Sequence, residues 1–333
     1  MLQLDLGKAI EEINKRKAKL VALQIPEGLK PRLAEIAGEL QQKTGAAIFS
    51  FVDPCFGACD AADERAKALG ADLLLHFGHT RFLGQHEVET VYLPLGYELD
   101  KKKMHFLVKK LIDLLKTGKV KKVALCSTIQ FLPFLDELKE ELLKNKFAVF
   151  IGKGRNVSDG QVLGCNYSAV GSIAAKCDAI VFLGDGLFHP LGISFCCSKP
   201  VFILNPLQEE VKLLEKEQDL FLRKRIAMIE KAKQAKVIAI WVSSKKGQQR
   251  MQLAIELRKK IEAKEKKAFI FVSDLLNPDF LLGVQVEAIV STACPRIALD
   301  DSSLFRQPIV NPSEMQVALG EKKLEQYCFE ELL

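Results

Sequence analysis

The sequence has no apolar run that approaches the roughly 20 residues a membrane-spanning helix needs. The basic-then-apolar pattern of a secretion signal is also missing from its first residues. These two absences argue against a membrane-bound or secreted protein. We therefore expect a cytoplasmic chain that does not bind membranes.

A strong excess of charge of one sign is missing as well. The formal net charge is +6, and lysine and arginine are interleaved along the chain with aspartate and glutamate. Direct binding to nucleic acid is therefore not expected. Hydrophobic residues make up 48% of the 333 residues and charged residues 27%, so the chain can bury large cores, and its length predicts two or three domains.

Short apolar segments alternate with segments of helical spacing. The first three apolar segments are 20–25, 46–52 and 72–77, and the pattern restarts near residue 119 and again near residue 237. Such alternation predicts parallel β-strands that are covered by helices on both faces. Among the helices, one is expected over residues 167–176.

The alternation contains an internal repeat of roughly 100 residues, which is a usual domain size. Its anchors are acidic residues ahead of an apolar strand, Asp72, Asp178 and Glu287, spaced by 106 and 109 residues. Repeats of this length are duplicated small domains. We predict an α/β fold of three homologous domains, with parallel sheets, around a pseudo-threefold centre. The domains are residues 1–100, 101–205 and 206–333, the last of which starts with a linker helix at 207–234.

Nine cysteines, in a chain without a secretion signal, favour metal or redox chemistry over structural disulfides. Cys59 and Cys165 occupy equivalent places in the repeat, because each lies 13 residues before the anchor acid. The third domain has Asp274 at this place, but Cys294 follows Glu287 by 7 residues. Each domain thus carries one cysteine near the carboxyl end of a strand, and a pseudo-threefold arrangement could bring three thiolates together.

Three neighbouring thiolates need a cation to balance their charge. Zinc, copper(I) and iron–sulfur clusters all accept thiolate ligands. A closed zinc site would need a fourth ligand, for which His79 is the candidate. A [4Fe-4S] cluster held by three cysteines would leave one iron open to a substrate. The spacing alone leaves these alternatives open, together with simple burial of the thiols.

The other cysteines lack partners in the repeat. Cys55 forms a Cys-x-x-x-Cys pattern with Cys59 that resembles part of the radical iron–sulfur motif, but Ala62 does not supply the third cysteine of that motif. An accessory or packing role therefore fits Cys55 better than a ligand role. Packing is also our interpretation of the remaining five, which are Cys126, Cys177, Cys196, Cys197 and Cys328.

Three polar loops are candidates for binding a small ligand. The first strand-to-helix turn offers backbone amides that suit an anion at a helix N-terminus. A second loop places an acid and a histidine among glycines, which is typical of a loop that closes on a ligand. After Cys294, an arginine and two acids could hold the carboxylate and ammonium groups of an amino acid. The predicted binding residues are Gln24, Glu27, Gly28, Gly184, Asp185, Gly186, His189, Arg296, Asp300 and Asp301.

Three segments of the sequence resemble the diphthamide-synthesis family of enzymes. They are Cys-Phe-Gly-Ala-Cys-Asp at 55–60, Gly-Asp-Gly-Leu-Phe-His-Pro at 184–190 and Ser-Thr-Ala-Cys-Pro-Arg-Ile-Ala-Leu-Asp-Asp at 291–301. The resemblance extends over essentially the whole chain, including the three-domain layout. The tandem pair Cys196 and Cys197 is a departure that the family pattern does not assign.

The resemblance implies a transferase that uses a [4Fe-4S] cluster and S-adenosylmethionine in a non-standard radical reaction. One cysteine from each domain binds the cluster in this family, which here would be Cys59, Cys165 and Cys294. The Cγ–S bond of S-adenosylmethionine is cleaved, and the 3-amino-3-carboxypropyl group is added to the imidazole C2 of one histidine of translation elongation factor 2. The resemblance further implies a homodimer, and the reaction needs an electron donor.

Two other functions remain open on the sequence. One is a structural zinc-binding interaction protein that uses Cys59, Cys165, Cys294 and His79. The other is a three-domain protein that binds a small molecule without any metal.

Overall fold

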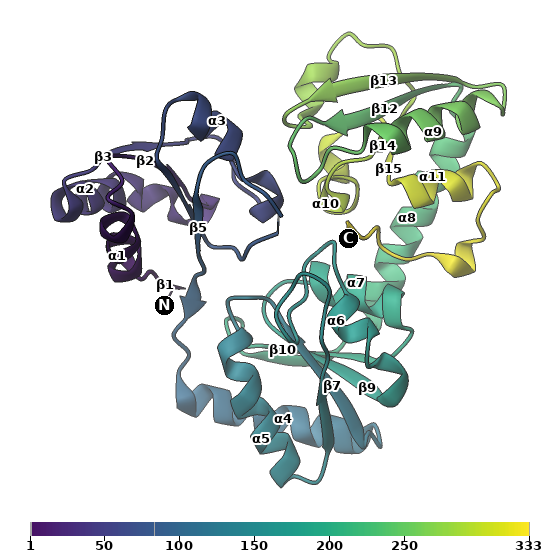
Figure 1. Ribbon diagram of the computed structural model, residues 1–333. Coiled ribbons are helices and arrows are strands. Elements are labelled where there is room, and N and C mark those ends of the chain that lie inside the picture. The colour runs from purple at the N-terminus through teal and green to yellow at the C-terminus, as the bar shows by residue number, and fades with distance from the viewer. Residues whose placement is uncertain (1, 83, 333) are drawn as a thin grey trace. The chain divides into compact units, whose positions relative to one another are not determined.

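The structure is a computed structural model that describes residues 2–82 and 84–332 (Figure 1). It divides into two compact units. The first unit contains the residues up to 100 together with 129–133, and the second contains 101–128 and the residues from 134 onward. The second unit holds two parallel sheets, so the chain forms three parallel-sheet α/β assemblies, which confirms the predicted fold class. The boundary at residue 205 within the second unit stays a prediction.

The first unit is built on a four-stranded parallel sheet with the order β3-β2-β4-β5. Helices α1 and α2 cover one face through Ile13, Ile36 and Leu40, and α3 packs on the other face through Ala66. Two short strands, β1 and β6, form a separate antiparallel pair. The elements are β1 Leu2–Gln3, α1 Leu6–Arg16, β2 Leu20–Gln24, the 3-10 helix η1 Glu27–Arg32, α2 Leu33–Thr44, β3 Ala47–Ser50, η2 Ala58–Asp60, α3 Asp63–Ala68, β4 Leu73–Phe77, β5 Thr90–Leu93 and β6 Gly96–Tyr97.

The first sheet of the second unit has the order β11-β10-β9-β7-β8, in which only β11 is antiparallel. Its strands β9 and β10 are buried along their whole length. The elements are α4 Lys101–Thr117, β7 Lys122–Ser127, η3 Leu132–Phe134, α5 Leu135–Lys144, β8 Ala148–Ile151, α6 Ser168–Gly171, η4 Ala174–Lys176, β9 Ala179–Leu183, α7 Phe188–Cys197, β10 Val201–Asn205 and β11 Glu210–Leu213.

The second sheet of this unit is parallel throughout, with the order β13-β12-β14-β15. Helices α8, α9 and α11 cover one face, and α10 lies on the other, where the single tryptophan, Trp241, is buried beside Phe305. The elements are α8 Lys216–Gln234, β12 Val237–Ser243, α9 Met251–Glu262, β13 Lys267–Ser273, η5 Pro278–Leu281, β14 Ala288–Ser291, α10 Pro295–Leu299, η6 Ser302–Leu304, β15 Ile309–Val310, α11 Pro312–Ala318 and η7 Leu324–Gln326.

The three sheets share one strand order, because in each the first strand lies between the second and the third and the fourth follows the third. The anchor acids of the sequence repeat have the same task in all three. Asp72 accepts the backbone N–H groups of Lys19 and Leu20 at 2.8 and 2.9 Å, and Asp178 accepts those of Lys121 and Lys122, the residue before β7 and its first residue. Glu287 accepts the N–H of Lys236 at 2.5 Å. Each acid thus binds the start of the first parallel strand of its sheet.

Two predicted helices differ from the structure. The stretch 207–234 is not one helix, because Glu210–Leu213 forms the edge strand β11 and α8 begins only at Lys216. The sequence of β11 alternates polar and apolar residues, which suits a strand. The stretch 167–176 is split into α6 and η4, since Gly171 is a poor helix former.

The longest helix among the described residues is α8, with 19 residues. It carries charged residues in both its first and its last turn. Within residues 2–82 and 84–332, no helix combines the length and the apolar character that crossing a membrane requires.

Candidate metal centre

Cys59 lies in the 3-10 helix η2, in the turn that follows strand β3 of the first unit. Its side chain is partly exposed. The backbone that directly follows the cysteine is held by Gln24, at the end of β2. The Gln24 amide donates to the carbonyl of Asp60 at 2.7 Å and accepts the N–H of Ala62 at 3.0 Å.

Gln24 is itself only 2% exposed. Its side-chain oxygen also lies 2.9 Å from Nδ1 of His76, which ends up beside it because β2 and β4 are adjacent parallel strands. Every polar atom of the Gln24 side chain is therefore used inside the protein. This residue was predicted to touch a ligand, and in the structure its contacts hold the Cys59 turn in place.

Cys165 lies in the loop between β8 and α6 and is partly exposed. The segment near residue 330 crosses this loop. The Cys165 carbonyl accepts the N–H of Leu332 at 2.8 Å, and Glu331 accepts the N–H of Tyr167 at 2.7 Å. The Tyr167 hydroxyl donates to the carbonyl of Gly164 at 3.0 Å, so the loop is fixed on both sides of the cysteine.

Cys294 is the residue immediately before helix α10, and it follows strand β14. Its thiol is partly exposed. Pro295 opens the helix, where its missing N–H costs nothing and its fixed φ favours the helical turn. The other end of this short helix is held by buried Arg225, which donates to the carbonyl of Ala298 at 2.6 Å.

The Cys165 and Cys294 loops share two aromatic neighbours. Burial raises the pKa of the Tyr167 phenol, and its electrostatic interactions with Cys196, Cys165, Glu331 and Cys294 raise it further. Phe188 lies between the two loops. A Cβ added at Gly164 would come within 2.3 Å of its ring, and the Arg296 guanidinium lies 4.8 Å from its centre on the other side. The loops that carry Cys165 and Cys294 therefore have Tyr167 and Phe188 as common neighbours.

The residues predicted to bind a ligand after Cys294 are close to this neighbourhood. Arg296 is exposed and pairs with Asp300, with 2.9 Å from Nε and 2.8 Å from Nη2 to the same carboxylate oxygen. Asp301 is exposed next to them, and partial desolvation together with the charge of Asp300 raises its pKa. The guanidinium thus lies against an aromatic ring with part of its surface in solvent.

The loop after β9 supplies the second predicted group. His189 stacks on Phe182 at 5.9 Å between ring centres, and burial and the positive charge of Arg296 lower its pKa to about 4. At Gly184 a Cβ would lie 2.8 Å from the Phe182 ring, so only glycine fits without movement. Gly186 has a φ of +72°, which glycine adopts at no cost. Asp185 between them is exposed.

The first turn that was predicted to bind a ligand contains an ion pair and a glycine with open space beside it. Glu27 and Lys30 form an ion pair at 2.7 Å, and Gly28 has open space where a side chain would begin. These residues lie in η1, after β2 of the first unit.

Four of the five cysteines that were interpreted as packing residues belong to a hydrophobic core, whereas Cys328 is partly exposed and accepts a hydrogen bond from Lys322 at 3.9 Å. Cys126 is fully buried and Cys177 is 3% exposed. Burial raises the pKa of Cys196 to about 12 and that of Cys197 to about 11. Thiols with such pKa values stay protonated at neutral pH and are poor ligands and nucleophiles.

His79 was predicted only as a zinc ligand beside the three cysteines. In the structure its Nδ1 lies 2.9 Å from Nε2 of His76, and burial lowers its pKa to about 4. His76 was not among the residues predicted to be functional. Its place at the carboxyl end of a buried strand, three residues before another histidine, was the available signal.

Comparison with known proteins gives a consistent result over almost the whole chain. Residues 25–328 match the family model of diphthamide synthesis proteins. The 2-(3-amino-3-carboxypropyl)histidine synthase of Pyrococcus horikoshii is 35% identical over 99% of this chain and 94% of its own. The synthase of Methanocaldococcus jannaschii is 32% identical over 98% and 91%. The crystal structure of Dph2 from Pyrococcus horikoshii with a 4Fe-4S cluster matches with a TM-score of 0.91 at 34% identity, covering 100% of this chain and 95% of that one.

Proposed function

Since the chain belongs to the diphthamide-synthesis family, we propose that it is a 2-(3-amino-3-carboxypropyl)histidine synthase. It transfers the 3-amino-3-carboxypropyl group of S-adenosylmethionine to the imidazole C2 of a histidine on translation elongation factor 2, the first step of diphthamide synthesis. The observation that carries the proposal is the match along the full chain to two synthases and to a relative that was crystallised with a 4Fe-4S cluster.

The chain's own residues fit such a cluster. Cys59, Cys165 and Cys294 lie in turns at the carboxyl ends of strands, and all three are partly exposed. In contrast, Cys126 and Cys177 are buried within the core, and the partly exposed Cys196, Cys197 and Cys328 lie at the end of helix α7 and after η7, not in loops that follow strands. Soft thiolates suit iron–sulfur clusters. We therefore assign the cluster to these three residues, one from each predicted domain.

When bound, the cluster would supply the electron that cleaves the Cγ–S bond and would offer one iron to the methionine end of S-adenosylmethionine. The protein's part is to hold that end of the cofactor. Arg296 suits the carboxylate because it keeps exposed N–H donors while Asp300 and the Phe188 ring fix its plane. Asp301, beside them, suits the ammonium group.

The loop after β9 completes the proposed cofactor site. His189 is neutral at physiological pH because its pKa is lowered to about 4, so it can accept or donate a hydrogen bond without adding positive charge. Gly184 and Gly186 let the backbone turn sharply around the exposed Asp185. Glu27 and Gly28 in the first unit remain proposed cofactor contacts, and Gln24 acts through the Cys59 turn.

The proposal also includes the protein substrate, the oligomeric state, the electron donor and the cellular location. The protein substrate is elongation factor 2, the active form is a homodimer, and an external electron donor reduces the cluster. A place in the cytoplasm fits the modification of a translation factor. The zinc-binding alternative with Cys59, Cys165, Cys294 and His79 is not favoured, because the relatives that match over the whole length are synthases.

The proposal is tested by an anaerobic assay. The purified chain is reconstituted with iron and sulfide, reduced with dithionite and mixed with elongation factor 2 and S-adenosylmethionine labelled in its aminobutyrate portion. We expect the label on one histidine of the factor, with a matching increase in its mass. A reduced, cluster-loaded protein that leaves the factor unlabelled would contradict the proposal.

A further inference from the structure

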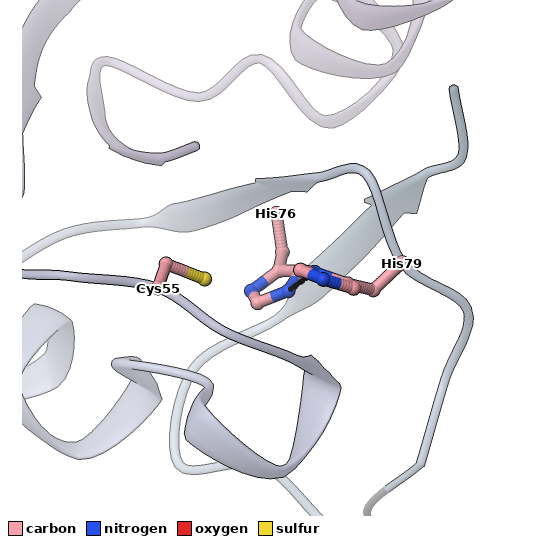
Figure 2. A group of neighbouring side chains, drawn as sticks. All are labelled: Cys55, His76 and His79. Carbon is pink, nitrogen blue, oxygen red and sulfur yellow. Dashed lines mark hydrogen bonds between the residues drawn. The ribbon is translucent and has the colours of Figure 1, made fainter. Parts of the chain in front are cut away.

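A second group of potential metal ligands lies wholly within the first unit. Cys55, His76 and His79 each offer one ligand atom, and these three atoms lie within 4.8 Å of one another. Figure 2 shows the Cys55 sulfur and the two imidazole rings facing one another at the end of the sheet. Cys55 and His76 are buried and His79 is partly exposed, so the group is accessible from one side.

The first histidine is oriented as metal-bound histidines usually are. Nδ1 of His76 lies 2.9 Å from the amide oxygen of Gln24. That oxygen can only accept, so Nδ1 carries the proton and Nε2 carries the lone pair. Metal-binding histidines typically donate their second ring nitrogen to an oxygen in this way, which fixes both tautomer and ring direction.

The second histidine is close to the position that a shared metal ion requires. Nε2 of His76 and Nδ1 of His79 are 2.9 Å apart, a hydrogen-bond distance. Two imidazole nitrogens on one tetrahedral zinc ion, each about 2.0–2.1 Å from it, lie about 3.3–3.4 Å apart. The rings therefore need to separate by only about half an ångström for an ion to replace the shared proton.

We propose that Cys55, His76 and His79 form a mononuclear zinc site, distinct from the three cysteines assigned to the iron–sulfur cluster. Two imidazoles and one thiolate are a donor set that zinc prefers. The fourth position would be filled by water from the side on which His79 is exposed. Binding displaces the proton of the Cys55 thiol, so that the thiolate offsets part of the charge of the ion.

The ion would join two parts of the first unit. Cys55 lies in the loop after β3, four residues before Cys59, whereas the histidines are at the end of β4 and just beyond it. A metal bond between these segments would fix the loop that carries Cys59. The role we assign is therefore structural, and it does not depend on the synthase reaction.

Cobalt(II) is the probe that tests the site, because cobalt bound to thiolate in four-coordinate geometry has a near-ultraviolet charge-transfer band and intense visible bands. The experiment uses the full-length chain with Cys59→Ser, Cys165→Ser and Cys294→Ser, which removes the cluster ligands. We expect these bands to saturate at one cobalt per chain and to be bleached by one equivalent of zinc.

Single substitutions in this background identify the ligands. Cys55→Ser should abolish the charge-transfer band, and His79→Gln should weaken cobalt binding by about tenfold or more. Cys328→Ser is the matched control, since this partly exposed cysteine should leave the spectrum unchanged. Circular dichroism of each variant shows whether the fold is kept, and His79→Gln, at the exposed edge, remains informative should Cys55→Ser fail to fold.

Absence of saturable cobalt binding, or a charge-transfer band that persists in Cys55→Ser, would overturn the zinc site. Neither result bears on the proposed synthase activity, which is assayed in the chain that keeps its three cluster cysteines. Conversely, a chain that fails to modify elongation factor 2 can still show the cobalt spectrum. The zinc site and the synthase activity can therefore be refuted independently of each other.

Discussion

Arg225 and Glu314 form a bidentate ion pair inside the second unit, with 2.7 Å between Nε and Oε1 and 2.6 Å between Nη2 and Oε2. Both side chains are buried, at 2% and 0% exposure. The same guanidinium donates to the carbonyls of Ala298 and Ile309, and Glu314 accepts the Tyr327 hydroxyl at 3.0 Å. This ion pair therefore links α8 and α11 to α10, the helix that begins after Cys294.

Replacing Arg225 by methionine should strongly destabilise the second unit. The change leaves the Glu314 carboxylate buried without its partner, which costs about 3–5 kcal/mol. The free energy of unfolding is measured in urea, with Trp241 emission as the reporter for the sheet beside α10. The double variant Arg225→Met with Glu314→Gln should recover part of the loss, because no unpaired charge then remains. A single variant as stable as the parent would show that the pair is not needed.

Gln24→Ala should loosen the Cys59 turn. It removes hydrogen bonds to Asp60, Ala62 and His76, and each buried polar group left unsatisfied costs about 1–3 kcal/mol. We expect faster hydrogen exchange at the Ala62 amide and a lower yield of cluster on reconstitution. Glu27→Gln, on the exposed turn nearby, serves as the control and should change neither. Unchanged exchange at Ala62 would refute the positioning role of Gln24.

The colour of the reconstituted protein should depend on three cysteines only. Cys59→Ala, Cys165→Ala and Cys294→Ala are each expected to abolish the broad visible absorption that dithionite bleaches. Cys126→Ala and Cys328→Ala should keep it, although Cys126→Ala leaves a small cavity in the core and lowers stability by about 1 kcal/mol. If one of the first three variants still gives the full absorption, the cysteine replaced in that variant is not a cluster ligand.

The anchor acids predict a pH dependence of stability. Hydrogen bonds from the backbone at Leu20 and Lys19 lower the pKa of Asp72 below its ordinary 3.8, and those from Lys121 and Lys122 lower that of Asp178. A carboxylate with a lowered pKa in the folded state stabilises the protein fully above its ordinary pKa, and this contribution is lost as the pH falls through the folded value.

The double variant Asp72→Asn and Asp178→Asn tests this dependence. Its thermal unfolding temperature should lie well below that of the parent at pH 7, and the difference should shrink steadily as the pH falls from about 4 to about 2. Asp113→Asn, on the exposed face of α4, is the matched control and should behave as the parent at every pH. A difference that is constant with pH would mean that the charge of the two carboxylates does not matter.

The sequence identified the repeat because its three acidic anchors have the same backbone task in each sheet. Asp72, Asp178 and Glu287 bind N–H groups at the start of the first parallel strand of each sheet, so their spacing reveals the three sheets. The edge strand β11 was missed, because four alternating residues between charged stretches are a weak signal beside a long helix. It pairs with β10 as a hairpin across the turn 206–209, and the available signal was Asn205 followed by proline, a pair typical of turns.

The site residues also differ in whether a local sequence pattern or a distant contact determines their role. The strand ends and glycine-rich turns located the loops that carry Cys165, Cys294 and Arg296. The role of Gln24 depends on Asp60 and His76, which lie 36 and 52 residues away along the chain. Such partners follow from the adjacency of β2 and β4, which the sequence does not specify in register. The prediction that Gln24 contacts a ligand stays a prediction.

Trp241, the single tryptophan, lies in the third sheet, 1% exposed, with its indole N–H donated to Ser273 at 2.8 Å. Emission excited in this indole therefore reports on one sheet out of three. A urea titration followed by fluorescence will record the loss of that sheet, while circular dichroism follows all of them. If the two curves separate along the denaturant axis, the chain unfolds in stages, and the size of the gap measures how independently its repeated parts hold together.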